Sequence, residues 1–207
     1  MVFSELTYTH TNDIMLDVIE QDDATKSFKQ IPRNLSSLDA FALTNSINLS
    51  PVKWWKSNNN ITATYNSFKN TNNSLNQENS KLSANIRSNN SFILPKKYTF
   101  EVMAMYQSAQ VYGMFDSKSI WMVNLGIQKS FLENRARIKV SLDDLFKTYE
   151  FRSTIHRDNL NFRTHNTFSS RRLGITFTYR FGKNDLKPSR QRRTGLEDES
   201  GRIGSGR

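Results

Sequence analysis

The segment Leu173-Gly174-Ile175-Thr176-Phe177-Thr178-Tyr179-Arg180-Phe181 decides the fold class of this chain. Its large apolar side chains stand at every second position, and glycine, threonine and arginine stand between them. Successive side chains of a β-strand point to opposite faces. The alternation therefore predicts a strand with one dry face and one wet face.

The same period of two recurs along the chain before this segment and predicts eight strands in all. No helical period recurs, and no run of about eighteen apolar residues occurs, which excludes transmembrane helices. We therefore predict an all-β, antiparallel fold. The predicted strands cover residues 2–9, 39–49, 59–68, 81–92, 98–107, 119–131, 135–145 and 171–181.

The connections between these strands alternate between short and long. Transmembrane β-barrels have this arrangement, because their periplasmic turns are short, their extracellular loops are long, and their strands cross the membrane in about ten residues. The alternation predicts an antiparallel transmembrane β-barrel, with its strands and extracellular loops within residues 1–181. The short links are 50–58, 93–97 and 132–134, and the long links, which would select a ligand, are 10–38, 69–80, 108–118 and 146–170.

This strand direction also sorts the aromatic side chains into two groups, as the interfacial girdles of a barrel require. Aromatic residues favour strand ends in soluble sheets too, so the pattern favours a barrel without proving one. The expected periplasmic group is Trp54, Trp55, Tyr98, Phe100, Phe131, Tyr179 and Phe181, and the expected outer group is Phe41, Phe68, Tyr106, Trp121 and Phe146.

The polar face of the predicted strands carries too many charges for a dry core, because an unpaired buried charge costs several kcal/mol. A water-filled or plugged lumen removes this cost, and so does a soluble sheet whose charged face lies in solvent. The loop alternation and the aromatic groups favour the lumen. The charged residues on this face are Arg87, Glu101, Arg137, Lys139, Asp143 and Arg180.

Residues 182–207 differ from the rest of the chain, because they lack a hydrophobic period and are rich in charge and glycine. We predict a charged, flexible C-terminal tail there. The whole chain has a formal net charge of +10, which favours anionic partners. For a barrel in an outer membrane the expected partners are membrane lipid and lipopolysaccharide, and nucleic acid is not expected.

No catalytic, cofactor-binding or metal-binding residue is predicted, and we do not expect an enzyme. The absence of cysteine excludes disulfide scaffolds, cysteine-based zinc sites and thiol nucleophiles. His10, His156 and His165 fall in predicted loops, and none has a second ligand at metal spacing. Asp22-Asp23 and Asp143-Asp144 are adjacent carboxylates, which a strand points to opposite faces, so they are poor acid–base partners.

Several segments together resemble the C-terminal part of a TonB-dependent-receptor-type outer-membrane barrel, in the subgroup called the outer membrane beta-barrel family of Bacteroidetes-type bacteria. Singly each match is weak, but together they span nearly the whole chain. The last strand and the tail beyond it carry the resemblance most clearly. The similar segments are Arg171–Lys183, Arg193–Glu199, Val140–Phe146 followed by Phe151–Thr154, Trp54–Asn60 and Val111–Gly113.

The resemblance implies a larger parent barrel of about 22 strands around a plug, of which this chain supplies the last eight. It implies uptake of a nutrient such as a metal chelate or a glycan, and an energy-coupling TonB system as a partner. The first residues, Met1–Tyr8, read as the inside of a strand and lack a signal peptide. We therefore expect either a protein that is not exported or a start within a longer mature chain.

Two other interpretations stay open. An eight-stranded barrel can close on itself, with residues 2–9 beside 171–181, and serve a structural or adhesive role. A soluble basic β-domain that binds nucleic acid would need exposed aromatic side chains on its basic face. Here the aromatic and the charged side chains alternate on opposite faces, which argues against the soluble domain.

Overall fold

The fold is described from a computed structural model, in which residues 1–22, 24–25, 27–34, 37–70, 77–157 and 160–182 are placed. Strands dominate this part of the chain, and its only helical element is the 3₁₀ turn η1 (Pro95–Lys97). No helix within these ranges is long and apolar enough to cross a membrane. Nearly all of the predicted tail, residues 183–207, lies outside the described residues.

Eight strands form one antiparallel sheet, and they are the eight strands that the period of two predicts. The prediction of an all-β, antiparallel fold is confirmed. The second, third and fourth strands of this sheet run further than predicted at both ends. In sheet order, which follows the chain, the strands are β1 (Val2–Asn12), β4 (Ser37–Val52), β5 (Trp55–Asn70), β6 (Gln77–Leu94), β7 (Tyr98–Gln107), β10 (Ile120–Phe131), β11 (Ala136–Asp143) and β14 (Arg172–Tyr179).

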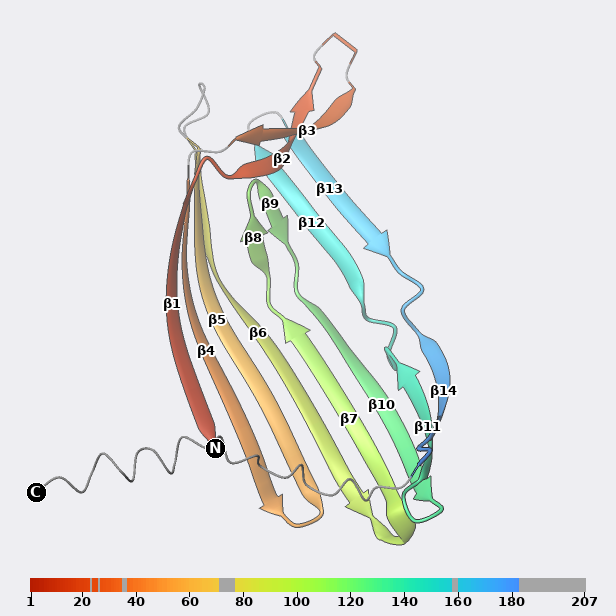
Figure 1. The fold of residues 1–207 in the computed structure, drawn as a ribbon. Coiled ribbons are helices and arrows are strands. Elements are labelled where there is room, and N and C mark those ends of the chain that lie inside the picture. Colours follow the sequence, from red (N-terminus) through yellow and green to blue (C-terminus); the bar gives the residue numbers. More distant parts are fainter. Residues whose placement is uncertain (23, 26, 35–36, 71–76, 158–159, 183–207) are drawn as a thin grey trace, which may run out of the picture.

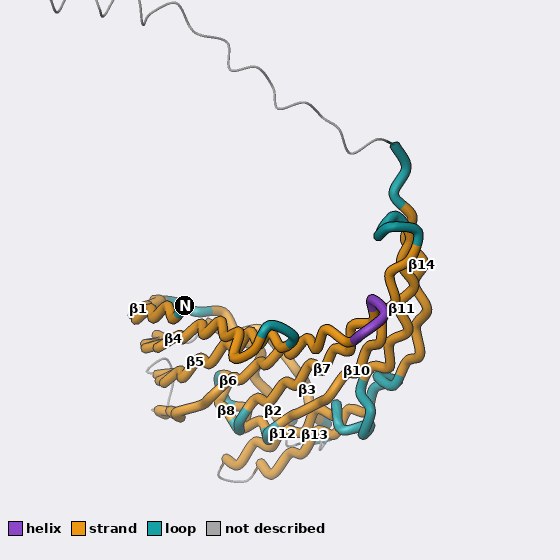
Figure 2. Tube along the Cα trace, turned by 90° about the horizontal axis from the view of Figure 1, so that it is seen from below, coloured by secondary structure: helices purple, strands orange, loops and turns teal. Residues whose placement is uncertain are grey.

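The sheet bends into an open arc, seen from the side in Figure 1 and along the strands in Figure 2. The strands β1 and β14 form the two ends of this arc. Among the described strands, β1 pairs only with β4 and β14 pairs only with β11. The pairing of residues 2–9 with 171–181 that a closed eight-stranded barrel requires is therefore not present.

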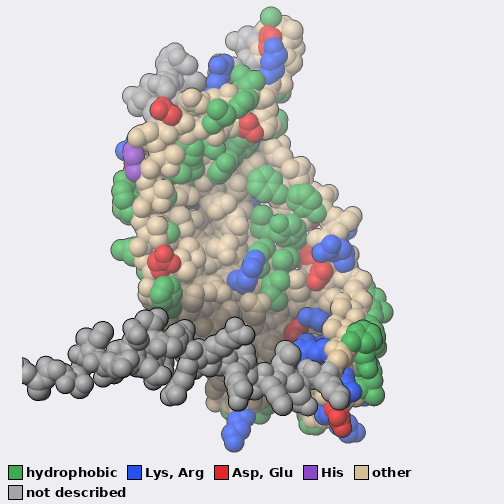
Figure 3. All heavy atoms as spheres, in the orientation of Figure 1, with side chains coloured by type: hydrophobic (Ala, Val, Ile, Leu, Met, Phe, Trp, Pro, Cys, Tyr) green, Lys and Arg blue, Asp and Glu red, His purple; other side chains and the backbone are tan. Residues whose placement is uncertain are grey.

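The register places the apolar side chains of neighbouring strands on one face of the sheet. Leu142 lies opposite Leu173, and Val140 lies opposite Ile175. Leu173 and Ile175 are 72% and 73% exposed, so they do not belong to a compact core. The other face lines the hollow of the arc, where Figure 3 shows a large area of uncharged polar side chains and backbone, with scattered charges and, toward the outer end, patches of hydrophobic side chains. The predicted division into an apolar outer face and a polar inner face is confirmed.

One polar patch interrupts the apolar outer face, on β5 and β6. The side chain of Ser88 donates a hydrogen bond to Asn59 (2.6 Å), and Asn90 donates one to Ser88 (2.9 Å). Trp55 donates its indole N–H to Asn90 (3.0 Å). Because these groups satisfy one another, the patch avoids most of the cost that unpaired polar groups have in an apolar medium.

The length of the four long connections predicts plain loops. Three of them instead contain further strands. The link 10–38 folds into a hairpin, while 108–118 and 146–170 extend the hairpins of the main sheet beyond its outer end. The centre of the fourth link, residues 71–76, lies outside the described residues. The added strands are β2 (Met15–Gln21), β3 (Phe28–Asn34), β8 (Gln110–Tyr112), β9 (Phe115–Ser117), β12 (Glu150–Arg157) and β13 (Leu160–Thr167).

The short links all lie at the opposite end of the sheet, which is the lower end in Figure 1. Val52 pairs with Trp55 across the first turn, and η1 forms the second. In the third turn, the consecutive residues Leu132, Glu133 and Asn134 have φ of +50°, +55° and +69°. The predicted segregation of short and long links to opposite ends is confirmed.

Candidate functional site

A hollow of about 420 Å³ opens on the inner face of the arc. Asn and Ser side chains supply much of its wall, with a few charged groups among them. These groups offer hydrogen-bond donors and acceptors together, which suits water or a polar ligand better than an apolar one. The lining residues are Asn89, Asn90, Ser91, Glu101, Val102, Met103, Asn124, Leu125, Gly126, Lys139, Ser141 and Asp143.

An ion pair crosses this hollow. The ammonium of Lys139 on β11 lies 2.5 Å from the carboxylate of Glu101 on β7. Arg172 and Asp143 form a second pair, 3.4 Å apart, between β14 and β11. The sequence places Glu101, Lys139 and Asp143 on the polar face, and the structure confirms that they line the inner side of the sheet. Pairing lowers the cost of placing these charges on the inner face.

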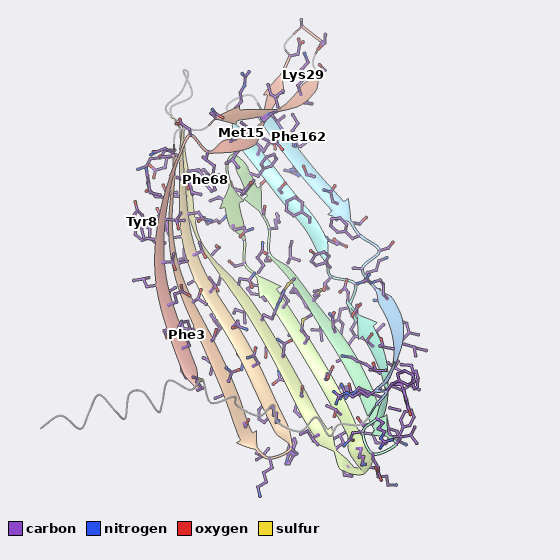
Figure 4. All side chains as sticks on the ribbon, viewed as in Figure 1. Phe3, Tyr8, Met15, Lys29, Phe68 and Phe162 are labelled. Atoms are coloured by element: carbon purple, nitrogen blue, oxygen red, sulfur yellow. The ribbon has the colours of Figure 1, made fainter. Side chains whose placement is uncertain are left out.

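A small apolar cluster lies at the outer end of the arc. It is formed by Leu16 on β2, Phe68 on β5 and Val111 on β8, which are 4%, 4% and 2% exposed. In Figure 1 the hairpin β2–β3 runs across the outer end of the sheet, and Figure 4 shows Phe68 and Phe162 beneath it. Ring contact between Phe28 and Phe162 (5.8 Å) joins the hairpin to β13. The hairpin therefore lies across the outer end of the sheet and is attached by apolar packing.

Gly113 fits the hairpin closely against the β8–β9 turn. Its φ is +57°, and a Cβ atom at this position would lie 3.1 Å from Leu16 Cδ1. Asn79 donates a hydrogen bond to the Gly113 carbonyl (2.8 Å), so β6 holds the same turn from its other side. Glycine both permits the left-handed backbone and leaves room for Leu16.

Asp144 organises the point at which β11 ends and the outer extension begins. The side chain is fully buried and accepts hydrogen bonds from the Ser170 hydroxyl (2.5 Å) and from the backbone N–H groups of Thr148 (2.9 Å) and Tyr149 (3.2 Å). Burial raises the pKa of this carboxyl, but the hydrogen bonds together outweigh burial and hold the pKa below its ordinary value. The hydrogen bonds therefore stabilise the anionic form of Asp144, which joins the end of β11 to the outer extension.

The aromatic side chains gather near both ends of the outer face, as predicted. Near the end with the short turns, Trp55 stacks on Phe92 (5.9 Å between ring centroids), and Phe131 contacts Phe177 (6.4 Å). At the outer end Trp121 contacts Phe146 (5.6 Å). One assignment is wrong: Phe68 was expected in the outer girdle, but it points to the inner side and packs in the cluster at the mouth.

Two of the histidines each lie beside one carboxylate in the structure. His10 Nδ1 lies 2.7 Å from Asp39, and His165 Nε2 lies 3.0 Å from Glu150. Among the described residues, no group of three His, Cys, Asp or Glu side chains lies close enough together to hold a metal ion. Two of the candidate residues are not described, since Asp23 and the side chain of His156 lie outside the placed atoms.

Comparison with known proteins identifies one family. The model of the Outer membrane protein beta-barrel family matches residues 1–179. Searches of curated proteins and of solved structures found no match.

Proposed function

Because this chain belongs to the Outer membrane protein beta-barrel family and lies in the bacterial outer membrane, we propose that it forms the C-terminal part of a larger receptor barrel. The receptor is of the TonB-dependent type and takes up a nutrient such as a metal chelate or a glycan. The outer mouth selects the nutrient, and the polar inner face forms part of its path.

The open edges of the sheet carry this proposal. Neither β1 nor β14 has a partner on its outer side among the described strands. Unpaired backbone N–H and C=O groups cost several kcal/mol each in lipid, so a sheet edge in the membrane must be paired. The wide arc in Figure 2 supports completion by further strands rather than closure of these eight strands alone.

The polar inner face and the hairpin across the outer end of the sheet support transport. The hollow beside Lys139 and Glu101 offers polar groups along the inner side of the sheet. Above it the β2–β3 hairpin lies across the outer end, attached through Leu16. A path with polar walls and a loop-covered entrance is what a receptor for a polar nutrient needs.

Disulfide crosslinking tests the barrel size. A variant carrying Leu6→Cys and Ile175→Cys, in the protein that the cell inserts into its outer membrane, is expected to form no disulfide within one chain. The control variant, Leu6→Cys with Leu43→Cys, is expected to crosslink because these two residues are direct partners on β1 and β4. Efficient crosslinking between positions 6 and 175 would show a closed eight-stranded barrel and contradict the proposal.

Uptake measurements test the transport role. Cells that carry the gene are expected to accumulate either ferric citrate, as a metal chelate, or a maltodextrin, as a glycan, faster than cells in which the gene is deleted. Dissipation of the proton gradient should abolish the difference, because TonB-type uptake draws on that gradient. Equal uptake of both probes by the two strains would refute the proposed substrate classes.

A further inference from the structure

A group of basic side chains lies beyond the outer end of the barrel sheet, around the base of the β12–β13 hairpin. Two hollows of about 470 and 340 Å³ adjoin there and share Lys118 and Arg152. Arg163 and His165 line the first hollow, and Lys147 lines the second. The remaining lining residues are Ser153, Thr154 and Thr164 in the first hollow, and Ser119, Trp121, Thr148 and Glu150 in the second.

We call Lys118, Lys147, Arg152 and Arg163 the basic rim. Its four permanent positive charges face a single lining carboxylate, that of Glu150. Glu150 lies 2.5 Å from Arg152, and no ion pair is found for the other three cations among the described residues. The rim therefore has an excess of positive charge that the described side chains do not neutralise.

The nearby carboxylates leave this excess in place. His165 and then Arg152 hold the pKa of Glu150 below its ordinary value through hydrogen bonds, so Glu150 is ionised and already engaged. Asp116, which lies in register with Thr154, is held by Lys81 at 3.2 Å. Among the described residues, no further carboxylate of the lining is left to pair with the rim, so an anion from outside can bind there without competing with one.

The strand register shows which way the rim faces. Arg152 lies opposite His165, and Thr154 lies opposite Arg163, so these side chains share one face of the hairpin. The other face carries Ile155, which is 1% exposed, and the ring of Phe162, which Phe28 of β3 contacts. The rim is therefore on the face turned away from the β2–β3 hairpin.

Aromatic side chains fix the depth of the rim in the membrane. Trp121 belongs to the apolar outer face of the barrel and also lines the hollow that contains Lys147. Its partner Phe146 lies in the same aromatic group, and Tyr149 contacts Phe168 close by (5.8 Å). Aromatic side chains of this kind lie at the level of the lipid headgroups. The basic rim begins at that level and extends outward from it.

We propose that the basic rim binds the phosphate group of a phosphorylated glycolipid in the outer leaflet. Guanidinium groups match phosphate oxygens with paired hydrogen bonds, and lysines add point charges. The apolar face directly below the rim accommodates the acyl chains of the same molecule, an attraction that free inorganic phosphate lacks. This inference does not depend on the transport role and holds for any barrel with this outer surface.

Binding of lipid A to the outer-membrane form of the protein, purified in detergent, tests the proposal. The wild type is expected to bind bisphosphorylated lipid A more tightly than lipid A whose phosphates have been removed. The variant Lys118→Gln/Arg163→Gln should bind phosphorylated lipid A about 25-fold more weakly, since each cation near a charged membrane surface contributes a factor of about five. Inorganic phosphate should compete only in large excess.

The variant Lys96→Gln/Lys97→Gln is the matched control. It removes the same charge from η1, at the opposite end of the strands, and should bind phosphorylated lipid A like the wild type. Heat-modifiable migration in gels confirms that each variant is folded. The proposal is overturned if both double variants bind alike, if removal of the phosphates changes nothing, or if inorganic phosphate binds as tightly as the lipid.

Discussion

Lys139 and Glu101 form an ion pair across an intervening strand. Their strands, β11 and β7, are not neighbours, because β10 lies between them. Gly126 of β10 lies opposite Glu101, and a Cβ atom there would lie 3.2 Å from Lys139 Cε and 3.4 Å from Glu101 Oε2. The missing side chain of Gly126 leaves room for the pair, which ties three strands together on the inner face.

A double-mutant cycle measures the coupling free energy between Glu101 and Lys139. Glu101→Gln, Lys139→Gln and the combined variant are expected to give a coupling of about 1 kcal/mol in the free energy of unfolding, measured with urea in lipid vesicles. The two side chains are 34% and 38% exposed, which limits the coupling through solvent screening.

The Arg172–Asp143 pair serves as the comparison for that cycle. Arg172 is 75% exposed, so the same cycle on this pair should give less than about 0.5 kcal/mol. Equal couplings for both pairs would show that the position across Gly126 has no special effect.

Adjacent residues of β7 test which face meets lipid. Val102 lies on the apolar outer face, opposite Leu125, while Met103 lines the inner hollow. Val102→Arg is expected to lower the free energy of unfolding by about 2–4 kcal/mol, because a cation near the middle of the membrane is costly. Met103→Arg should lower it by less than about 1 kcal/mol, since its charge reaches the hydrated lumen. The reverse order in urea unfolding would invert the assignment of the faces.

The main sheet is predictable from sequence because its information is local. A period of two marks each strand, and the short links fix the pairing of neighbours. Phe68 shows where this reasoning stops. Its distance along β5 predicts the correct end of the barrel. The face depends on the alternation of side chains along the strand, which turns Phe68 to the inner side, where it packs with Leu16.

The features of the outer end depend on contacts between distant segments. The Asp144 carboxylate accepts a hydrogen bond from the Ser170 hydroxyl. The backbone N–H of Asp144 donates a hydrogen bond to the side-chain oxygen of Asn124 (2.9 Å). The basic rim joins Lys118 to Arg163 only through the pairing of β9, β12 and β13. No single stretch of sequence contains either arrangement, so a motif search could not find them.

Substitutions of two neighbouring residues of β2 test how the β2–β3 hairpin is attached to the outer end of the sheet. Leu16 is 4% exposed within the apolar cluster, and Met15 beside it is 67% exposed. Leu16→Ala should cost about 2–4 kcal/mol in the local stability of the β2–β3 hairpin, through lost burial and the cavity left behind. Hydrogen exchange measured by mass spectrometry should then show faster exchange of the hairpin amides. Met15→Ala should leave their exchange unchanged, and a similar acceleration in both variants would argue against attachment through Leu16.

The buried Asp144 predicts a pH dependence of stability at the outer end. Its pKa in the folded protein is below the ordinary value, so its stabilising effect is complete at neutral pH. The effect is lost as the pH falls below about 4 and through the folded pKa, because protonation replaces an acceptor with a donor. Asp144→Asn should lower the free energy of unfolding by about 1–3 kcal/mol at pH 7. Asparagine tolerates the φ of +46° at this position, so the substitution tests the charge and its hydrogen bonds rather than the backbone.

The difference between wild type and Asp144→Asn is the measurement that decides this point. Urea unfolding at pH 7 and at pH 3 should show a smaller difference at the lower pH, because the Asp144 carboxyl of the unfolded chain binds a proton there while the folded protein still favours the anion. Asp143→Asn is the control, because Asp143 is more than a third exposed and pairs with Arg172 at 3.4 Å, so its effect at pH 7 should be below about 1 kcal/mol. A difference for Asp144→Asn that stays constant between the two pH values would mean that the carboxylate charge does not stabilise the junction between β11 and the outer hairpin.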